Sequence, residues 1–163
     1  MKIGLISDTH DNFESILNAV MLFNYRNVDV VLHAGDFVSP RAVESFDGVK
    51  LIGVLGNNDI DIPGLTSAFK KIHGELKGEI FESEYDGMKF AVYHGTDSAQ
   101  RGLLIKSGKY DVVVYGHTHR KVSSKTGRTL VINPGTAKGW IFGFNATAAI
   151  FDTQNRNLEF ISV

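Results

Sequence analysis

Two histidines, His117 and His119, stand one residue apart directly after an apolar run and Gly116. Neutral imidazole is the side chain that proteins use most often to bind metals. A strand that ends in Gly-His-x-His can direct both rings toward one point beyond its carboxyl end. One such pair is weak evidence, because either histidine could be an ordinary surface residue. The metal hypothesis therefore needs support from other parts of the chain.

Four further segments end in the same way, with a short apolar run followed by residues that can bind a metal. In chain order these residues are Asp8 with His10, Asp36, Asn57 and His94. An Asp after a single strand is more often a turn or helix-cap residue than a ligand. However, in open α/β sheets ligands bind outside the carboxyl ends of the strands, so five similar strand ends favour one common site. The glycines beside them predict tight turns or close approaches of the backbone: Gly35, Gly56, Gly95 and Gly116.

The mixture of donor atoms limits the choice of metal. Carboxylate, amide oxygen and imidazole together suit a first-row divalent ion such as Mn, Fe, Co, Ni or Zn, whereas calcium prefers oxygen ligands alone. Seven ligands exceed what one ion needs and fit two ions with one bridging carboxylate. Two ions about 3.5–4 Å apart form a clamp for in-line displacement at phosphorus. We interpret the remaining histidines, His33 inside a strand and His73 near a helix end, as structural.

Composition narrows the class of protein. The 163-residue chain has the length of one domain, and we expect a single domain over residues 1–163. With 43% hydrophobic residues, and with 17 basic against 18 acidic residues, it is typical of a soluble globular protein and lacks the basic surface of a nucleic-acid binder. It has no cysteine, no apolar segment of membrane-spanning length and no signal-peptide pattern. We therefore expect a cytoplasmic protein without thiolate ligands.

The elements that must position these residues change in type along the chain. The first half predicts strands over 2–7, 28–32 and 49–55, helices over 11–25, 39–46 and 65–73, and a loop over 61–64. In the second half, Asp86-Gly87 predicts a hairpin turn between strands 78–84 and 88–93. A helix over 98–107, with Leu103 and Leu104 facing inward, strands over 111–115 and 129–132, and a final hairpin of 144–152 with 157–163 follow. This order predicts an α/β protein with two packed, mixed sheets and outer helices.

Five short blocks, taken in order, resemble the signature of the calcineurin-like metallophosphoesterases. They are Asp8-Thr9-His10, Gly35-Asp36, Gly56-Asn57-Asn58-Asp59, His94-Gly95 and Gly116-His117-Thr118-His119. The short chain and its Asn133-Pro134-Gly135 segment look like the small YfcE-type phosphodiesterases of bacteria and archaea. The resemblance implies a four-layer α/β sandwich of two mixed sheets flanked by helices. It also implies two divalent ions per chain, with manganese or nickel favoured and zinc, iron or cobalt as alternatives.

The resemblance further implies how the ligands and the catalytic roles are divided. The first ion is expected to bind Asp8, His10, Asp36 and His119, and the second to bind Asp36, Asn57, His94 and His117. Asp36 bridges the two ions, and a hydroxide held by the ions attacks the phosphodiester in line with the leaving oxygen. Asp36 and Asn58 are the expected catalytic residues.

One position departs from the family pattern. Many members have a histidine that contacts the phosphate and protonates the leaving group, and here Asn58 stands in its place. Asparagine can hydrogen-bond a phosphoryl oxygen but cannot supply a proton. Loss of a general acid typically costs about 10²–10⁴ in rate, and the loss is greatest for poor leaving groups. We therefore expect activated aryl phosphodiesters to be the best substrates.

Two other functions remain open from the sequence. A nuclease of the same superfamily would need a basic groove or an added DNA-contacting domain, and neither is visible. A protein-interaction module of the Vps29 type departs from the full ligand set, whereas here all seven ligand positions are filled, which favours catalysis. We expect a small phosphodiester substrate, with no membrane or nucleic-acid partner, and a homodimer is left open.

Overall fold

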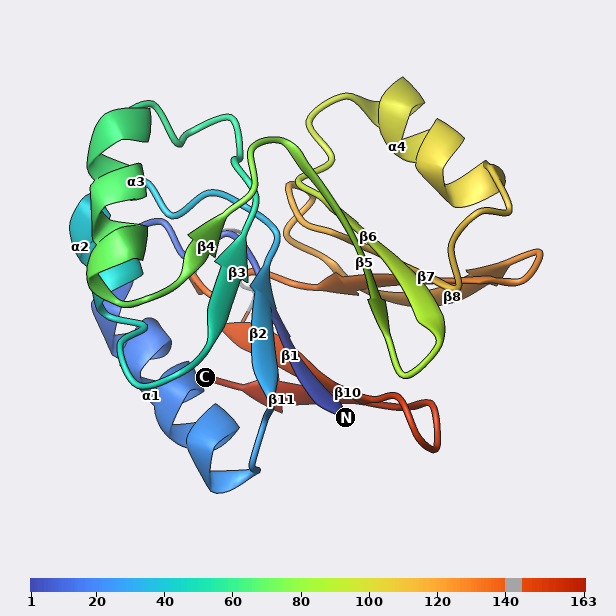
Figure 1. Ribbon diagram of the computed structural model, residues 1–163, viewed down its shortest axis with the longest axis horizontal. Coiled ribbons are helices and arrows are strands. Elements are labelled where there is room, and N and C mark those ends of the chain that lie inside the picture. Colours follow the sequence, from blue (N-terminus) through green and yellow to red (C-terminus); the bar gives the residue numbers. More distant parts are fainter. Residues whose placement is uncertain (140–144) are drawn as a thin grey trace.

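The computed structural model describes residues 1–139 and 145–163, in which two mixed β-sheets pack face to face between two layers of helices (Figure 1). Three helices cover the outer face of the first sheet and one covers the second. They are α1 (Phe13–Tyr25), α2 (Pro40–Glu44), α3 (Ile62–Lys71) and α4 (Ser98–Lys106). The predicted four-layer α/β fold is confirmed.

The first sheet has six strands, of which four run parallel. In spatial order they are β11 (Asn157–Ser162), β10 (Thr147–Asp152), β1 (Lys2–Ile6), β2 (Val30–His33), β3 (Leu51–Gly53) and β4 (Glu75–Leu76). Strands β1 to β4 are parallel, and β10 and β11 extend the sheet antiparallel to them. The carboxyl ends of β1, β2 and β3 therefore meet at one edge.

The second sheet has five strands, and its three central strands are parallel. The order is β5 (Ile80–Tyr85), β6 (Met88–Tyr93), β7 (Val112–Tyr115), β9 (Thr129–Pro134) and β8 (Lys121–Thr126). The predicted hairpin of β5 and β6 is confirmed, with Tyr85 paired to Met88 across the turn. Strands β6, β7 and β9 run parallel and end at a common edge, which is where His94 and the His-x-His segment follow.

Side chains that alternate along a central strand pack into two separate apolar clusters, one on each face of its sheet. Successive side chains of a strand point to opposite faces, so a strand covered on both sides is apolar throughout. In β7, Val112 and Val114 join Ile3 and Leu5 of β1 in the cluster between the sheets. Val113 lies instead in a smaller cluster beneath α4. Apolar packing thus holds the two sheets face to face. As a consequence, the strand ends of one sheet have a defined position relative to those of the other.

Capping side chains mark the helix starts, and one of these starts corrects a prediction. Asn12 caps α1 and Ser39 caps α2, each accepting the backbone N–H of the third helical residue. Residues 61–64 were expected to form a loop, but α3 begins at Ile62 and Asp61 caps it by accepting the Gly64 N–H at 3.0 Å. The prediction is wrong because Asp-x-Pro is also a helix start, with proline in the first turn, where its missing N–H costs nothing.

The second half contains further corrections. Leu103 does not face inward, because it is 72% exposed, whereas Leu104 packs against the sheet as predicted, together with Ile105. Strand β8 escaped prediction because its residues are almost all polar, as an edge strand allows, and β4 is only two residues long. The predicted final hairpin forms from Thr147 onward, and residue 144 lies outside the described residues.

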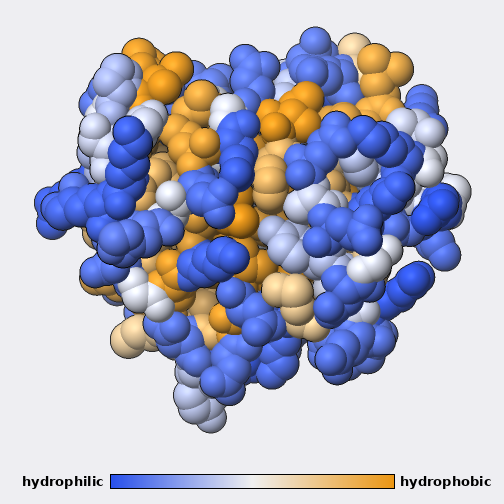
Figure 2. Space-filling model, viewed as in Figure 1, coloured by the Kyte–Doolittle hydropathy of each residue, from blue (hydrophilic) through white to orange (hydrophobic). Residues whose placement is uncertain are grey.

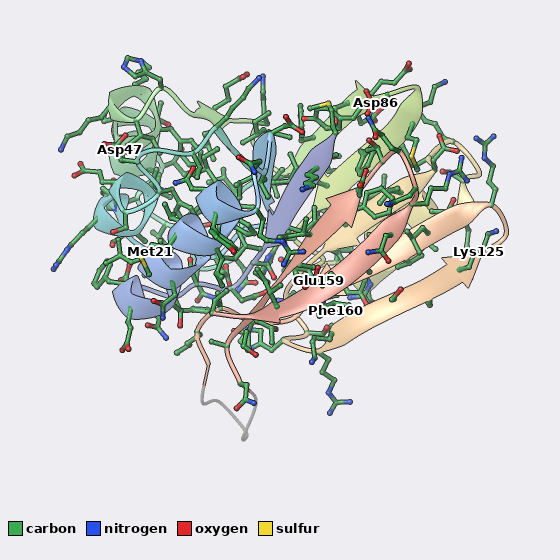
Figure 3. All side chains as sticks on the ribbon, turned by 90° about the horizontal axis from the view of Figure 1, so that it is seen from below. Met21, Asp47, Asp86, Lys125, Glu159 and Phe160 are labelled. Carbon is green, nitrogen blue, oxygen red and sulfur yellow. The ribbon has the colours of Figure 1, made fainter. Side chains whose placement is uncertain are left out.

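The face seen in Figure 2 is largely hydrophilic, with hydrophobic areas between the hydrophilic residues. Viewed from below, Glu159 and Phe160 lie on β11 and Met21 on α1 (Figure 3). An ion pair between Arg26 and Glu159 joins the end of α1 to β11. None of the helices in the described part of the chain is long and apolar enough to cross a membrane.

Candidate metal centre

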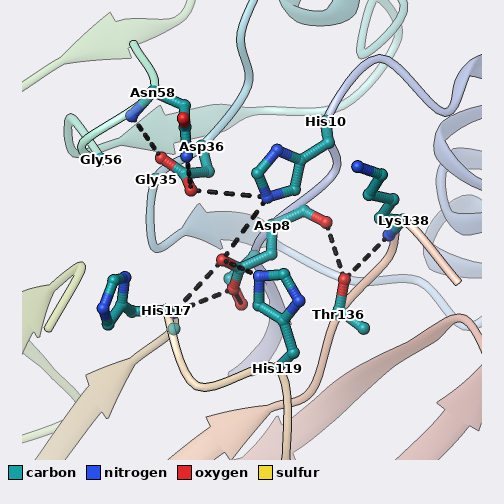
Figure 4. Close-up of polar contacts among 12 residues, drawn as sticks. Asp8, His10, Gly35, Asp36, Gly56, Asn58, His117, His119, Thr136 and Lys138 are labelled. Carbon is teal, nitrogen blue, oxygen red and sulfur yellow. Dashed lines mark hydrogen bonds and ion pairs between the residues drawn. The ribbon is translucent and has the colours of Figure 1, made fainter. Parts of the chain in front are cut away.

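The structure gathers the predicted ligand residues at the meeting edge of the two sheets (Figure 4). Each residue lies just beyond the carboxyl end of a parallel strand: Asp8 and His10 after β1, Asp36 after β2, Asn57 after β3, His94 after β6, and His117 and His119 after β7. Two overlapping groups of acidic and imidazole ligands result, and they share Asp8. Segments separated by more than a hundred residues are thereby brought into direct contact.

The first group consists of Asp8, His10 and His119. The Nε2 atom of His119 lies 3.1 Å from Oδ1 of Asp8, and that of His10 lies 3.9 Å from the same oxygen. Asp8 is fully buried, and its carboxylate also accepts the backbone N–H of His117. The three side chains offer donor atoms that all lie within 4.8 Å of one another, a spacing that one ion can span.

Asp36 belongs to the second group, with Asp8 and His94, and it also faces His10 of the first. Its Oδ2 atom is 3.4 Å from Nε2 of His10 and 3.4 Å from Nε2 of His94. Asn57 completes this side, with its Oδ1 atom 3.1 Å from Nε2 of His94. One oxygen of Asp36 therefore faces one imidazole of each group at the same distance.

His94 is oriented by its other ring nitrogen. Nδ1 lies 2.7 Å from the carbonyl oxygen of Ala34, which can only accept, so Nδ1 carries the proton. Nε2 faces Oδ2 of Asp36 and Oδ1 of Asn57, which can accept its proton, and once that proton is lost the lone pair points to the same place. Hydrogen bonds of this kind fix the tautomer of metal-binding histidines.

The two rings of the His-x-His pair do not converge on one point, contrary to our expectation from the sequence. His119 contacts Asp8, whereas the ring of His117 packs edge-on against that of His94 with centroids 5.2 Å apart. His119 therefore lies in the first ligand group, whereas His117 lies beside His94 and belongs to neither group.

Left-handed backbone is concentrated at the predicted ligands. Five of them have positive φ: Asp8 (53°), His10 (41°), Asp36 (64°), His117 (63°) and His119 (58°). Each such residue with a Cβ costs on the order of 1–3 kcal/mol and persists only where surrounding contacts impose it, typically at functional sites. The loop backbone, more than strand alternation, thus aims these side chains.

Two of the four predicted glycine positions show most clearly why no side chain is tolerated. Gly35 has φ of 91°, and a Cβ there would come within 2.7 Å of the Gly56 backbone nitrogen. A Cβ on Gly56 would lie 2.5 Å from the backbone nitrogen of Asp36 and would overlap its Oδ1 atom. The loops after β2 and β3 can approach each other only because both residues are glycine.

Burial and neighbouring groups shift the pKa values of the ionisable residues in the site. Burial alone would raise the pKa of Asp36, but hydrogen bonds from His94 and Asn58 and the charge of His94 hold it well below its usual range. Burial would lower the pKa of His94, and Asp36 outweighs it, so that pKa is raised. Burial lowers the pKa of His10 and of His117. At neutral pH, Asp36 is ionised and His10 and His117 are neutral, as metal ligands must be. His94, whose pKa Asp36 raises, would have to release its Nε2 proton to bind a metal.

One atom shows directly that the residues fit a cation. Nε2 of His10 is buried and has no hydrogen-bond partner among the described residues, although two carboxylate oxygens face it. A neutral imidazole turned toward carboxylates leaves lone pairs opposed, and a positive ion between them removes that conflict. Imidazole, carboxylate and amide donors together suit first-row divalent metals.

Comparison with known proteins decides the family. A model described as the calcineurin-like phosphoesterase superfamily domain matches residues 1–156. The chain belongs to this superfamily. A phosphodiesterase of Methanocaldococcus jannaschii, MJ0936, is 40% identical over 159 residues, covering 96% of this chain and 95% of the relative. These matches confirm the prediction of a phosphoric ester hydrolase.

Solved structures of the superfamily share the fold. A structure of an archaeal phosphodiesterase superposes with a TM-score of 0.92 at 38% identity, covering 100% of both chains. The phosphoesterase YfcE of E. coli superposes with a TM-score of 0.73 at 19% identity, again over 100% of both chains. The predicted likeness to small YfcE-type proteins is confirmed at the level of the fold.

Asp59 is a site residue whose role the sequence did not reveal. Its buried carboxylate accepts backbone N–H bonds from Gly56 at 2.7 Å, Val38 at 2.8 Å and Asp36 at 2.9 Å. Burial raises its pKa, although these three bonds work in the opposite direction. Asp59 thus joins the loop after β2, which carries Asp36, to the loop after β3, which carries Asn57. The signal available was its position three residues after Gly56, which is typical of a side chain that closes a turn.

Asn133 acts in the same way on the other sheet. Its Nδ2 atom donates to the carbonyl of Gly116 at 2.8 Å and to Oγ1 of Thr118 at 3.0 Å, so it holds the loop between the paired histidines. The Asn-Pro-Gly sequence indicates a turn, but nothing in it names partners about fifteen residues away.

His33 is structural, as predicted, and it supports the first ligand loop. Its Nδ1 atom accepts the N–H of Gly35 at 3.1 Å, so Nε2 carries the proton toward Oγ1 of Thr9 at 3.2 Å. The ring stacks on Phe37 with centroids 3.6 Å apart, and its full burial lowers its pKa well below the ordinary value. A neutral histidine therefore anchors the residue between Asp8 and His10.

Proposed function

We propose that this protein hydrolyses phosphodiesters at a site that holds two divalent metal ions. One ion would be bound by Asp8, His10, Asp36 and His119, and the other by Asp36, Asn57, His94 and His117. The observation that carries the proposal is the position of Asp36, whose Oδ2 atom lies 3.4 Å from an imidazole of each group. The similarity to phosphodiesterases of 40% and 38% identity supports the diester as the substrate class.

Two divalent ions supply Lewis acidity, which neutralises phosphoryl oxygens and lowers the pKa of water. The chain contributes preorganisation, because its ligands are fixed before any ion binds. Ser7 lies 2.6 Å from Oδ2 of Asp8, and Thr136 donates to the Asp8 carbonyl at 3.0 Å. These contacts hold the fully buried carboxylate in one orientation. The side chain therefore loses little conformational entropy when metal and substrate bind.

In this proposal Asn58 orients Asp36 and also hydrogen-bonds the substrate. Its backbone N–H donates to Oδ1 of Asp36 at 2.9 Å, and its Nδ2 atom donates to Oδ2 at 2.7 Å. The amide nitrogen carries two hydrogens, so one can hold Asp36 while the other donates to a phosphoryl oxygen. Asn58 cannot protonate a leaving group, which restricts efficient hydrolysis to esters whose leaving oxygen needs no proton.

Metal content and activity test the proposal together. Protein loaded with manganese or nickel should contain two ions per chain by elemental analysis and should hydrolyse bis-p-nitrophenyl phosphate, and a chelator should abolish the activity. His94→Ala should lower both the metal content and the turnover. His73→Ala is the matched control, because His73 is exposed and outside the site. One ion or fewer per loaded chain would contradict the two-ion proposal.

Substrate preference tests the diester assignment separately. Bis-p-nitrophenyl phosphate should be hydrolysed faster than p-nitrophenyl phosphate at equal concentration. The two share one leaving group, so the comparison isolates the second ester. A clear preference for the monoester would refute the assignment.

A further inference from the structure

A cavity of about 390 Å³ opens directly beside Asn57. One wall comes from the loop after β3 and the first residue of α3, and the other from the end of β6 and the start of α4. These two helices stand on either side of the upper edge in Figure 1. The residues that line it are Leu55, Gly56, Asn57, Asp59, Ile62, Glu79, Tyr93, Thr96, Asp97 and Gln100. Thr96 links the cavity to the metal centre, because its hydroxyl donates to Oδ1 of Asn57 at 3.3 Å.

The lining of this cavity combines apolar walls with negative charge. Leu55, Ile62 and Tyr93 supply the apolar part, while Glu79 and Asp97 supply carboxylates at the exposed rim. No lysine, arginine or histidine is among the residues that line it. A second phosphate or a carboxylate on the substrate would therefore be repelled, whereas an ammonium group would be attracted.

The basic residue nearest to Glu79 in the sequence does not neutralise the carboxylates at the cavity rim. Lys77, two residues before Glu79, forms an ion pair with Glu75 at 2.6 Å. Asp97 is fixed rather than free, since its Oδ1 atom accepts the backbone N–H groups of Ala99 and Gln100 at the start of α4. Glu79 is thus the carboxylate best able to turn toward a bound group.

Positive charge lies instead beside His10. Lys138 is held there by its backbone, which donates to the carbonyl of Asp8 at 2.8 Å and accepts from the side chain of Asn12 at 2.7 Å (Figure 4). Its charge acts on His10. His10 and His94 contact the same oxygen of Asp36, and the cavity adjoins the His94 group through Asn57. Lys138 thus lies on the His10 side and the two rim acids on the Asn57 side, where Arg101 is turned to the Gly95 carbonyl and the Tyr115 ring and does not line the cavity.

We propose that this cavity binds one alcohol group of the substrate and selects small amino alcohols that carry a positive charge. This inference rests on the proposed phosphodiesterase function and narrows its substrate class. The ammonium group lies toward Glu79 and Asp97, with the apolar part of the alcohol against Leu55, Ile62 and the ring of Tyr93. Aromatic faces attract ammonium groups in addition to the carboxylates.

Three p-nitrophenyl diesters with different second alcohols test the selection: choline (cationic), ethanol (neutral) and glycolate (anionic). Phosphorus NMR follows which ester bond breaks, so the result does not depend on which alcohol leaves. We expect kcat/KM for the choline diester to exceed that for the glycolate diester by about tenfold or more at low salt, with the ethyl diester between them. The ratio should shrink as salt increases.

Charge variants identify the residue responsible. Glu79→Gln should reduce the ratio, and Glu79→Lys should reverse it. Glu84→Gln is the matched control, because Glu84 is another exposed glutamate on the same hairpin but does not line the cavity, and it should keep the wild-type ratio. Equal kcat/KM for all three diesters, with bis-p-nitrophenyl phosphate still hydrolysed, would overturn the cavity assignment alone. Failure of the metal-loaded wild type to hydrolyse any diester would overturn the proposed function as well.

Discussion

Replacing Asp59 by asparagine should destabilise the fold even though the substitution preserves size and shape. The Asp59 carboxylate is 5% exposed and accepts three backbone N–H groups, two of them on one oxygen. An asparagine amide has one oxygen and one NH₂ group. Whichever way it is turned, at least one backbone N–H loses its acceptor and faces another donor.

The size of the effect follows from these contacts. A hydrogen bond to a charged group contributes about 1.5–3 kcal/mol, and leaving a buried donor unsatisfied costs about 1–3 kcal/mol. Asparagine needs no desolvation of a charge, which offsets part of the loss, since burial raises the pKa of Asp59. We therefore expect a net loss of about 1.5–3 kcal/mol. For a chain of this size that corresponds to a fall of roughly 3–12 °C in Tm.

Thermal and urea unfolding of the chelator-treated protein measure this effect without a contribution from bound metal. Asp61→Asn is the control, because Asp61 caps α3 at an exposed position and asparagine caps a helix about as well as aspartate. The control should stay within about 0.5 kcal/mol of the wild type. If Asp59→Asn had the same Tm and the same urea midpoint as the control variant, the three hydrogen bonds would not hold the Asp36 and Asn57 loops as we describe.

Three further outcomes are expected. Asp36→Asn removes the negative charge that lies 3.4 Å from both His10 and His94, so elemental analysis and kinetics should show lower metal occupancy and lower kcat; two retained ions with near-wild-type turnover would contradict bridging. Asn58→His should raise kcat more for alkyl than for p-nitrophenyl leaving groups and should add an ionisation near neutral pH; parallel plots of log kcat against leaving-group pKa would place residue 58 away from the leaving group. Manganese at a hundred times its Kd should stabilise the protein by about 2.7 kcal/mol per site in urea titrations, or about 5.4 kcal/mol for two independent sites, and an unchanged midpoint would show that the folded chain does not bind it.

The sequence by itself determined the strands that carry the ligands and the ligands that follow them, although not β4, β8 or the start of α3. Apolar runs followed by a polar ligand predicted β1, β2, β3, β6 and β7, because buried parallel strands are apolar on both faces. The rule that ligands bind at the carboxyl ends of such strands then brought their terminal residues to one place. Donor type, from Asp8 to His119, is a property of the residue itself, so the class of metal could be predicted without coordinates.

The tertiary structure alone decided how those residues meet. The left-handed backbone at Asp8, Asp36 and His119 is imposed by contacts and not by local preference, since no L residue favours it in isolation. Asp59 accepts from Asp36 across 23 positions, and Asn133 donates to Gly116 across 17, and such pairings depend on which strands lie side by side within each sheet. The polar edge strand β8 likewise has no apolar period to reveal it and forms because β9 offers an unpaired edge. Local patterns specify strands and side-chain chemistry, whereas apolar packing between the sheets sets the distances at which that chemistry can operate.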